Sequence, residues 1–171
     1  MRKHNGMRPQ DIVVLLKIIS LDKRPWQNKD LASQLFISPS EISDSLNRSA
    51  LAGLIQPDKK RNVYRTSLME FLEHGLHYVF PVLPGGMVNG LYTAHSHPFM
   101  QKYFSSDIQY VWPDPYGEVR GLSIEPLYKD QTKAAQQDEI LYLMLALADV
   151  IRVGRVRETN QAVSELKKLV L

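Results

Sequence analysis

The chain has 171 residues and a formal net charge of +3, and its 44% hydrophobic and 23% charged residues are ordinary for a globular protein. It contains no cysteine, which excludes a disulfide framework and any thiolate metal site. Its longest apolar run, from Ile140 to Ala148, falls well short of the roughly 20 residues that a membrane-spanning helix needs. The N-terminal residues carry charges with no apolar stretch behind them, so we expect a soluble, cytoplasmic protein without a membrane partner.

The charge is distributed unevenly along the chain. Residues 1–65 hold twelve Lys and Arg against six Asp and Glu, a net charge of +6, whereas residues 66–171 carry a net charge of −3. Surface charge varies along many chains, so this difference alone decides little. A basic N-terminal half is nevertheless typical of a nucleic-acid-binding segment joined to a separate body.

Helical spacing of apolar residues predicts two short helices near the N-terminus. The first covers residues 11–21. The second helix follows Asn28, which we expect to act as its N-cap. This helix places Leu31, Ala32 and Leu35 on one face, which we expect to pack against a core.

A third helix is predicted to start at Ser38, which can act as its N-cap. Pro39 would take the first helical position, where a missing N–H costs nothing, and Glu41 would close a Ser-x-x-Glu capping box. The connection to the second helix is so short that the two helices must pack crosswise, which leaves the outer face of the third helix free. That face carries polar side chains able to bind base edges and phosphates, namely Ser40, Ser43, Asp44, Asn47 and Arg48.

The pattern DLA-x-x-L-x-ISPSEIS-x-x-L-x-R-x-x-x-x-GLI resembles the winged helix-turn-helix of MarR-like and ArsR-like bacterial transcription regulators. The resemblance covers residues 8–80. It implies a wing in which residues 54–56 form one strand, residues 57–62 a turn and residues 63–66 the return strand. Many relatives carry a basic residue after the serine that corresponds to Ser43, whereas this chain has Asp44, an acid that could accept from a cytosine amino group but repels phosphates.

This resemblance implies a set of DNA contacts. The third helix would lie in the major groove of double-stranded DNA, Arg48 and Lys29 would hold phosphates, and the wing would follow the backbone or enter the minor groove. The candidate DNA-binding residues are therefore Lys29, Ser38, Pro39, Ser40, Ser43, Asp44, Asn47, Arg48, Lys59, Lys60, Arg61 and Asn62. One such module reads only a few base pairs, so we expect a homodimer.

The remainder of the chain predicts a helical body with a β-hairpin. The expected elements are a helix over 67–80, an ordered loop over 81–107, strands over 108–112 and 119–124 joined as a hairpin, and helices over 132–153 and 155–170 with Gly154 as the break. The predicted fold is thus α+β, mostly α, with a winged helix-turn-helix domain over residues 1–80 and a C-terminal body over residues 81–171.

Two features of this body leave alternatives open. The segment DEILYLMLALADVI is apolar around nearly its whole circumference, so it lies either in the protein's own core or across a dimer interface. Seven of the fifteen aromatic residues fall between Tyr92 and Tyr116, where they either line a pocket for a small-molecule effector or fill a core.

The sequence predicts a DNA-binding regulator rather than an enzyme. It contains no HExxH, P-loop, GxGxxG or GxSxG motif, so we expect no catalytic residues and no cofactor. His95 and His97 stand two residues apart and raise the hypothesis of a metal site, although ordinary hydrogen-bonded histidines are the simpler interpretation. The alternative function is a winged-helix adaptor, or an antitoxin-like protein, whose partner is another protein.

Overall fold

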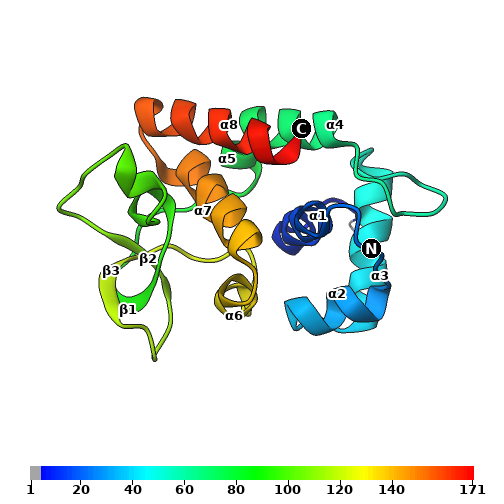
Figure 1. The fold of residues 1–171 in the computed structure, drawn as a ribbon, viewed down its shortest axis with the longest axis horizontal. Coiled ribbons are helices and arrows are strands. Elements are labelled where there is room, and N and C mark those ends of the chain that lie inside the picture. The colour runs from blue at the N-terminus through cyan, green and yellow to red at the C-terminus, as the bar shows by residue number, and fades with distance from the viewer. Residues whose placement is uncertain (1–4) are drawn as a thin grey trace.

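The computed structural model describes residues 5–171 and shows an α+β fold that is mostly helical, as the sequence predicts (Figure 1). Its helices and strands are α1 (Pro9–Leu21), α2 (Asn28–Leu35), α3 (Pro39–Leu51), α4 (Arg65–His74), α5 (Leu76–Val79), β1 (Met87–Tyr92), η1 (Ala94–Ser96), η2 (Met100–Lys102), β2 (Tyr110–Pro113), β3 (Val119–Ser123), α6 (Gln131–Gln136), α7 (Glu139–Val153) and α8 (Val156–Val170). Figure 1 shows α3 near one end of the long axis and the small sheet at the other end, with α1 and α7 between them.

The N-terminal helices begin where polar side chains can satisfy their first N–H groups. Ser38 caps α3 as predicted, because its Oγ accepts a hydrogen bond from the Glu41 N–H at 3.2 Å. The predicted closing of the capping box by Glu41 was wrong, because the Glu41 carboxylate instead accepts from Gln10 Nε2 at 2.8 Å and ties α3 to α1. The predicted N-cap of α2 was wrong, since the helix already includes Asn28 and is preceded by Gln27 as its N-cap. The Gln27 N–H donates to the Asp30 carboxylate at 2.7 Å, which favours this earlier start.

A short hairpin follows α3. Ile55 and Val63 form a single antiparallel bridge, flanked by hydrogen bonds from Gln56 N to Asn62 O and from Tyr64 N to Leu54 O, both 2.9 Å long. The predicted return strand to residue 66 was too long. The Tyr64 carbonyl accepts from Leu68 N at 2.9 Å and so begins α4. The predicted helix over 67–80 is present as α4 and α5, with Gly75 between them.

The three strands form a small sheet that closes on itself, which corrects two predictions. The segment over 81–107 is not only a loop, because it contains β1 and two short 3-10 helices. Strands β2 and β3 are not a hairpin: β1 pairs antiparallel with both, and they run parallel to each other. Close backbone approaches make this arrangement possible, since a Cβ on Gly90 would overlap the carbonyl oxygen of Trp112, and one on Gly117 would overlap Gly90 itself.

The predicted helix over 132–153 is broken into α6 and α7. Asp138 caps α7 by accepting from Leu141 N at 3.0 Å, and its carboxylate also accepts from Lys17 Nζ at 2.6 Å and from Ser20 Oγ at 2.7 Å. The contacts of Asp138 with α1 hold the start of α7 in place and so set the position of the break between α6 and α7. Gly154 ends α7 as predicted.

One hydrophobic core runs through both predicted segments of the chain. It contains apolar side chains of α1, α2, α3, α4, α7 and α8 together with Trp112 of β2. The apolar faces of α7 lie in this core, and Met144, Leu145 and Leu147 have no exposed surface. The structure therefore places the long apolar helix in the protein's own core. Among the described residues, no helix has both the length and the apolar character to cross a membrane.

Candidate nucleic-acid interface

The outer face of α3 is open to solvent. Ile42 and Leu46 point into the core, whereas Ser40, Ser43 and Asn47 are exposed. Four more predicted contact residues at or near this face, Ser38, Pro39, Asp44 and Lys29, are also exposed. The turn between α2 and α3 is three residues long, and the left-handed conformation of Phe36 ends α2 there. Figure 1 shows α3 running across α2, with the hairpin turn projecting beside it.

Arg48 has a different contact from the one predicted. Its guanidinium donates from Nε to Asp11 Oδ2 at 2.8 Å and from Nη2 to Asp11 Oδ1 at 2.7 Å. The Arg48 side chain is only 10% exposed, and that of Asp11 is completely buried. The hydrogen bond to Asp11 raises the pKa of Arg48, so this cation stays charged and joins α3 to α1.

The electrostatic character of the α3 face is mixed. A hollow of about 320 Å³ borders this face, lined by Asn5, Arg8, Glu41, Asp44, Asn47, Arg48 and Leu51. Arg8 Nη1 lies 4.0 Å from the Glu41 carboxylate, and both side chains are about half exposed. With Arg48 paired to Asp11, the acids Glu41 and Asp44 offset the charge of Arg8. The helix face therefore offers hydrogen-bonding groups more than positive charge.

Positive charge is concentrated in the neighbouring turn at residues 57–62, which we call the basic turn. Lys59, Arg61 and Asn62 are exposed, and Lys60 is half-buried. Lys60 takes a left-handed backbone conformation with φ of 51°, and its N–H donates to Gln56 O at 3.0 Å. Asn62 Nδ2 donates to Gln56 Oε1 at 3.1 Å. The basic turn is thus a folded hairpin end that holds three cations together.

A contact between the basic turn and the α1–α2 connection was not predicted from the sequence. The Arg61 guanidinium carbon lies 4.2 Å from the centroid of the Trp26 ring, and Arg61 Nη1 donates to the Trp26 carbonyl. The two residues are 35 positions apart, so no local pattern indicates their contact. The only available signal was a tryptophan inside the otherwise polar segment DKRPWQ.

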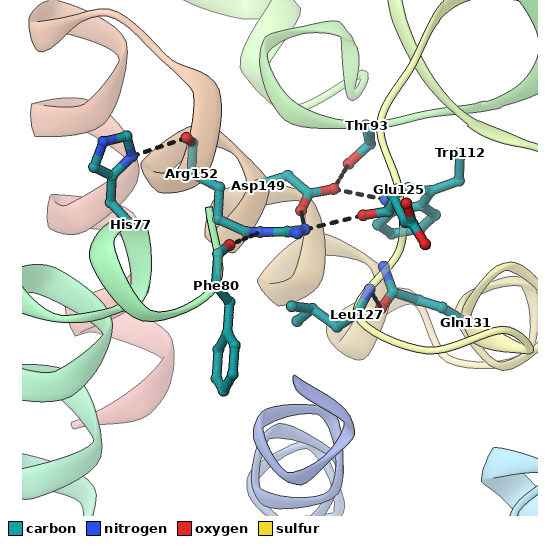
Figure 2. A network of polar contacts seen from close by, with 9 residues as sticks. All are labelled: His77, Phe80, Thr93, Trp112, Glu125, Leu127, Gln131, Asp149 and Arg152. Atoms are coloured by element: carbon teal, nitrogen blue, oxygen red, sulfur yellow. Dashed lines mark hydrogen bonds and ion pairs between the residues drawn. The ribbon is translucent and has the colours of Figure 1, made fainter. Parts of the chain in front are cut away.

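A buried polar network lies at the opposite side of the core, and Figure 2 shows its members converging on α7. The fully buried Asp149 carboxylate accepts from Thr93 Oγ1 at 2.8 Å, from Trp112 Nε1 at 2.6 Å and from Arg152 Nη1 at 2.8 Å. Arg152 also donates to the carbonyls of Phe80 at 2.9 Å and Glu125 at 3.1 Å. The network joins the closed sheet to α7 and is a structural joint, because its charged groups are paired within the core.

The histidines that raised the metal hypothesis bond to their own chain. His95 Nε2 lies 2.8 Å from Ile108 O, and His97 Nδ1 accepts from Phe99 N at 3.1 Å. The His97 ring packs edge-on against Tyr142 at 4.2 Å between centroids, and burial lowers the pKa of His97 to about 4. Within residues 5–171, no three His, Cys, Asp or Glu side chains gather in a way that would hold a metal ion.

The aromatic residues between 92 and 116 do not line one common pocket. Trp112 is buried in the core, whereas Tyr116 is 93% exposed. Tyr92 and Phe104 border a small polar hollow of about 310 Å³ beside His95. A larger hollow of about 540 Å³ lies elsewhere, between the α2–α3 turn and residues 127–129. An effector site in the aromatic segment stays a prediction.

Comparison of the chain with protein-family models, curated proteins and solved structures finds no match. The resemblance of residues 8–80 to winged helix-turn-helix regulators therefore rests on the sequence pattern. The arrangement offers two neighbouring surfaces for binding, the polar outer face of α3 and the basic turn.

Proposed function

We propose that this protein is a sequence-specific DNA-binding transcriptional regulator of the winged helix-turn-helix type. The observation that carries the proposal is the exposed polar face of a capped α3 beside a hairpin turn that holds Lys59, Lys60 and Arg61. In this proposal α3 enters the major groove, where Ser40, Ser43 and Asn47 face base edges. The basic turn acts as the wing and meets the phosphate backbone or the minor groove.

The proposal assigns phosphate binding mainly to the wing. Arg48 is already paired with buried Asp11, so the remaining candidates are Lys29 and the three cations of the basic turn. Four phosphate contacts would give a log–log slope of affinity against salt of roughly −3 to −4 per subunit, since each contact adds about −0.9. The Asp44 carboxylate would suit a base-edge amino group better than a phosphate.

A dimer on a two-fold-related site remains part of the proposal, because one module reads only a few base pairs. Its interface must lie outside the apolar faces of α7, which the protein's own core covers. We retain a small-molecule effector as a proposed ligand of the body and add no residue assignment for it.

The proposal is tested by fluorescence anisotropy with a pool of labelled duplexes across about 50 to 300 mM salt. Wild type is compared with a variant in which Lys59, Lys60 and Arg61 become Ala, and with Ser43→Ala/Asn47→Ala. The charge-matched control changes three exposed cations elsewhere, Lys102, Arg120 and Arg157, to Ala. The proposal is supported if the first variant loses salt-sensitive binding, the second binds more weakly than wild type, and the control binds as wild type does.

The alternative function is an adaptor whose α3 binds another protein. It is favoured by one observation, the pairing of Arg48 with Asp11, which leaves Glu41 and Asp44 prominent on the α3 face. In that case wild type and the charge-matched control would bind duplex DNA equally weakly. That result would overturn the DNA-binding proposal.

A further inference from the structure

We propose that Trp26 is a positioning residue for the wing: it holds Arg61 and thereby fixes the orientation of the basic turn relative to α3. This inference rests on the proposed DNA-binding function. It assigns a role to a residue in the α1–α2 connection, outside both α3 and the basic turn. We call the contact between Trp26 and Arg61 the clasp.

The basic turn has limited support from its own hairpin. Its strands share one antiparallel bridge, Ile55 with Val63, and the turn adds the hydrogen bonds of Gln56 with Lys60 and Asn62. Isolated two-stranded hairpins are marginally stable in water. A contact with a firmly held neighbour would therefore narrow the range of positions that the turn occupies.

Trp26 is such a neighbour. Its ring is partly buried and packs against the hydrophobic core. The connection that carries it is fastened to the end of α1, because Arg24 donates from Nε to Leu21 O at 3.1 Å and from Nη2 to Ser20 O at 3.0 Å. The clasp thus joins the end of a short hairpin to a segment that is hydrogen-bonded to the end of a buried helix.

The chemistry of the clasp leaves Arg61 able to bind DNA. An indole face attracts a guanidinium through the ring quadrupole, and the Trp26 carbonyl accepts one N–H. A guanidinium has five N–H donors, so Arg61 can donate others to a phosphate while it stays on the ring. Fixing Arg61 before binding lowers the entropy cost of ordering the turn, which also carries Lys59 and Lys60.

The test measures duplex binding and its salt dependence for Trp26→Ala and Trp26→Phe. We expect Trp26→Ala to weaken binding about three- to tenfold and to make the salt slope shallower, because the wing cations meet fewer phosphates. Trp26→Phe keeps an aromatic face and should restore most of the affinity. Tyr116→Ala, which removes an exposed aromatic from the sheet end, is the matched control and should bind as wild type does.

A second readout needs no DNA. The chain has two tryptophans, and Trp112 is fully buried, so quenching of the emission by acrylamide, an uncharged quencher, reports mainly on Trp26. Arg61→Ala should increase this quenching by uncovering the ring, whereas Arg157→Ala should leave it unchanged. Thermal unfolding of each variant separates loss of the clasp from loss of the fold.

The two claims fail in different ways. If wild type binds DNA and Trp26→Ala binds with the same affinity and salt slope, the positioning role is overturned and the proposed function stands. If wild type does not bind DNA, both the proposed function and the positioning role of Trp26 are overturned. Unchanged quenching in Arg61→Ala would overturn the clasp itself, whatever the DNA result.

Discussion

Arg48 of α3 and Asp11 of α1 form a bidentate ion pair. The Asp11 carboxylate is completely buried, and the Arg48 side chain is nearly buried. The pair fixes the position of α3 on the helix that occupies the centre of the N-terminal core. A residue that the sequence pattern marks for DNA contact therefore serves first to hold the candidate recognition helix in place.

The first prediction is that Arg48→Ala destabilises the fold. Removing the guanidinium leaves a buried carboxylate without its charged partner, which costs about 3 to 5 kcal/mol. Urea unfolding at neutral pH measures the change. The double variant Arg48→Met/Asp11→Asn should recover much of the stability, because it removes both charges. A single variant as stable as wild type would show that the ion pair does not hold α3.

The second prediction concerns Asp44, the exposed acid on the α3 face. Asp44→Asn should raise affinity for mixed-sequence duplexes about two- to fivefold at low salt, because it removes a charge that repels phosphates. It should also reduce discrimination between sequences if Asp44 reads a base amino group. Glu118→Gln, an exposed acid at the sheet end, is the control. Equal behaviour of the two variants would place Asp44 outside the interface.

The third prediction is a pH dependence of stability caused by His97. Burial lowers its pKa to about 4 from the ordinary 6.5, so the unfolded chain takes up the proton first as the pH falls. The stability that depends on the neutral ring is complete above pH 6.5 and declines between pH 6.5 and about 4, by at most about 3 kcal/mol. Urea unfolding of wild type and His97→Gln across this range measures it. An identical decline in both proteins would contradict the assignment.

The fourth prediction concerns Asp138, which links the start of α7 to α1. Burial raises the pKa of this carboxyl, but hydrogen bonds from Lys17, Leu141 N and Ser20 outweigh burial and hold the pKa below its usual value. The stability that it contributes is therefore present above the unfolded-state pKa and is lost as the pH falls below about 3.8. Lys17→Met should cost about 3 kcal/mol at neutral pH.

The control for this pair is Lys17→Met/Asp138→Asn, which retains a capping side chain and removes both charges. Circular dichroism during urea unfolding compares the three proteins at neutral pH and near pH 3. The single variant should differ less from wild type at the lower pH, because the stability that comes from the lowered pKa of Asp138 declines once the pH is below the unfolded-state pKa. A difference that does not change with pH would rule out the ion pair as its cause.

Local signals predicted the parts of the fold that local chemistry determines. Ser38 caps α3 through its own side chain, and Gly154 ends α7, and both were predicted. The break before α7 was missed because Asp138 is fixed by Lys17, 121 residues away. Strand β1 was missed because Gly90, which the close approach to Trp112 requires, makes its segment resemble a loop.

In the candidate interface too, local signals predicted some features, and contacts between distant residues determined the others. Exposure of Ser40, Ser43 and Asn47 follows from helical spacing and was predicted. Arg48 contacts a residue 37 positions away, and Arg61 contacts a residue 35 positions away. No rule based on local spacing reveals contacts over such separations. Sequence alone thus predicted the exposed face of α3, and the fold determined that Arg48 and Arg61 are bonded to other groups of the protein.

The measurement that tests the central claim most directly is the salt dependence of duplex binding for wild type and for the Lys59, Lys60 and Arg61 triple-alanine variant. If these cations are the wing, the log–log slope should become shallower by about 2.7, because three phosphate contacts are lost. The Lys102, Arg120 and Arg157 variant should keep the wild-type slope. Equal slopes for all three proteins would contradict the account and favour a protein partner for α3.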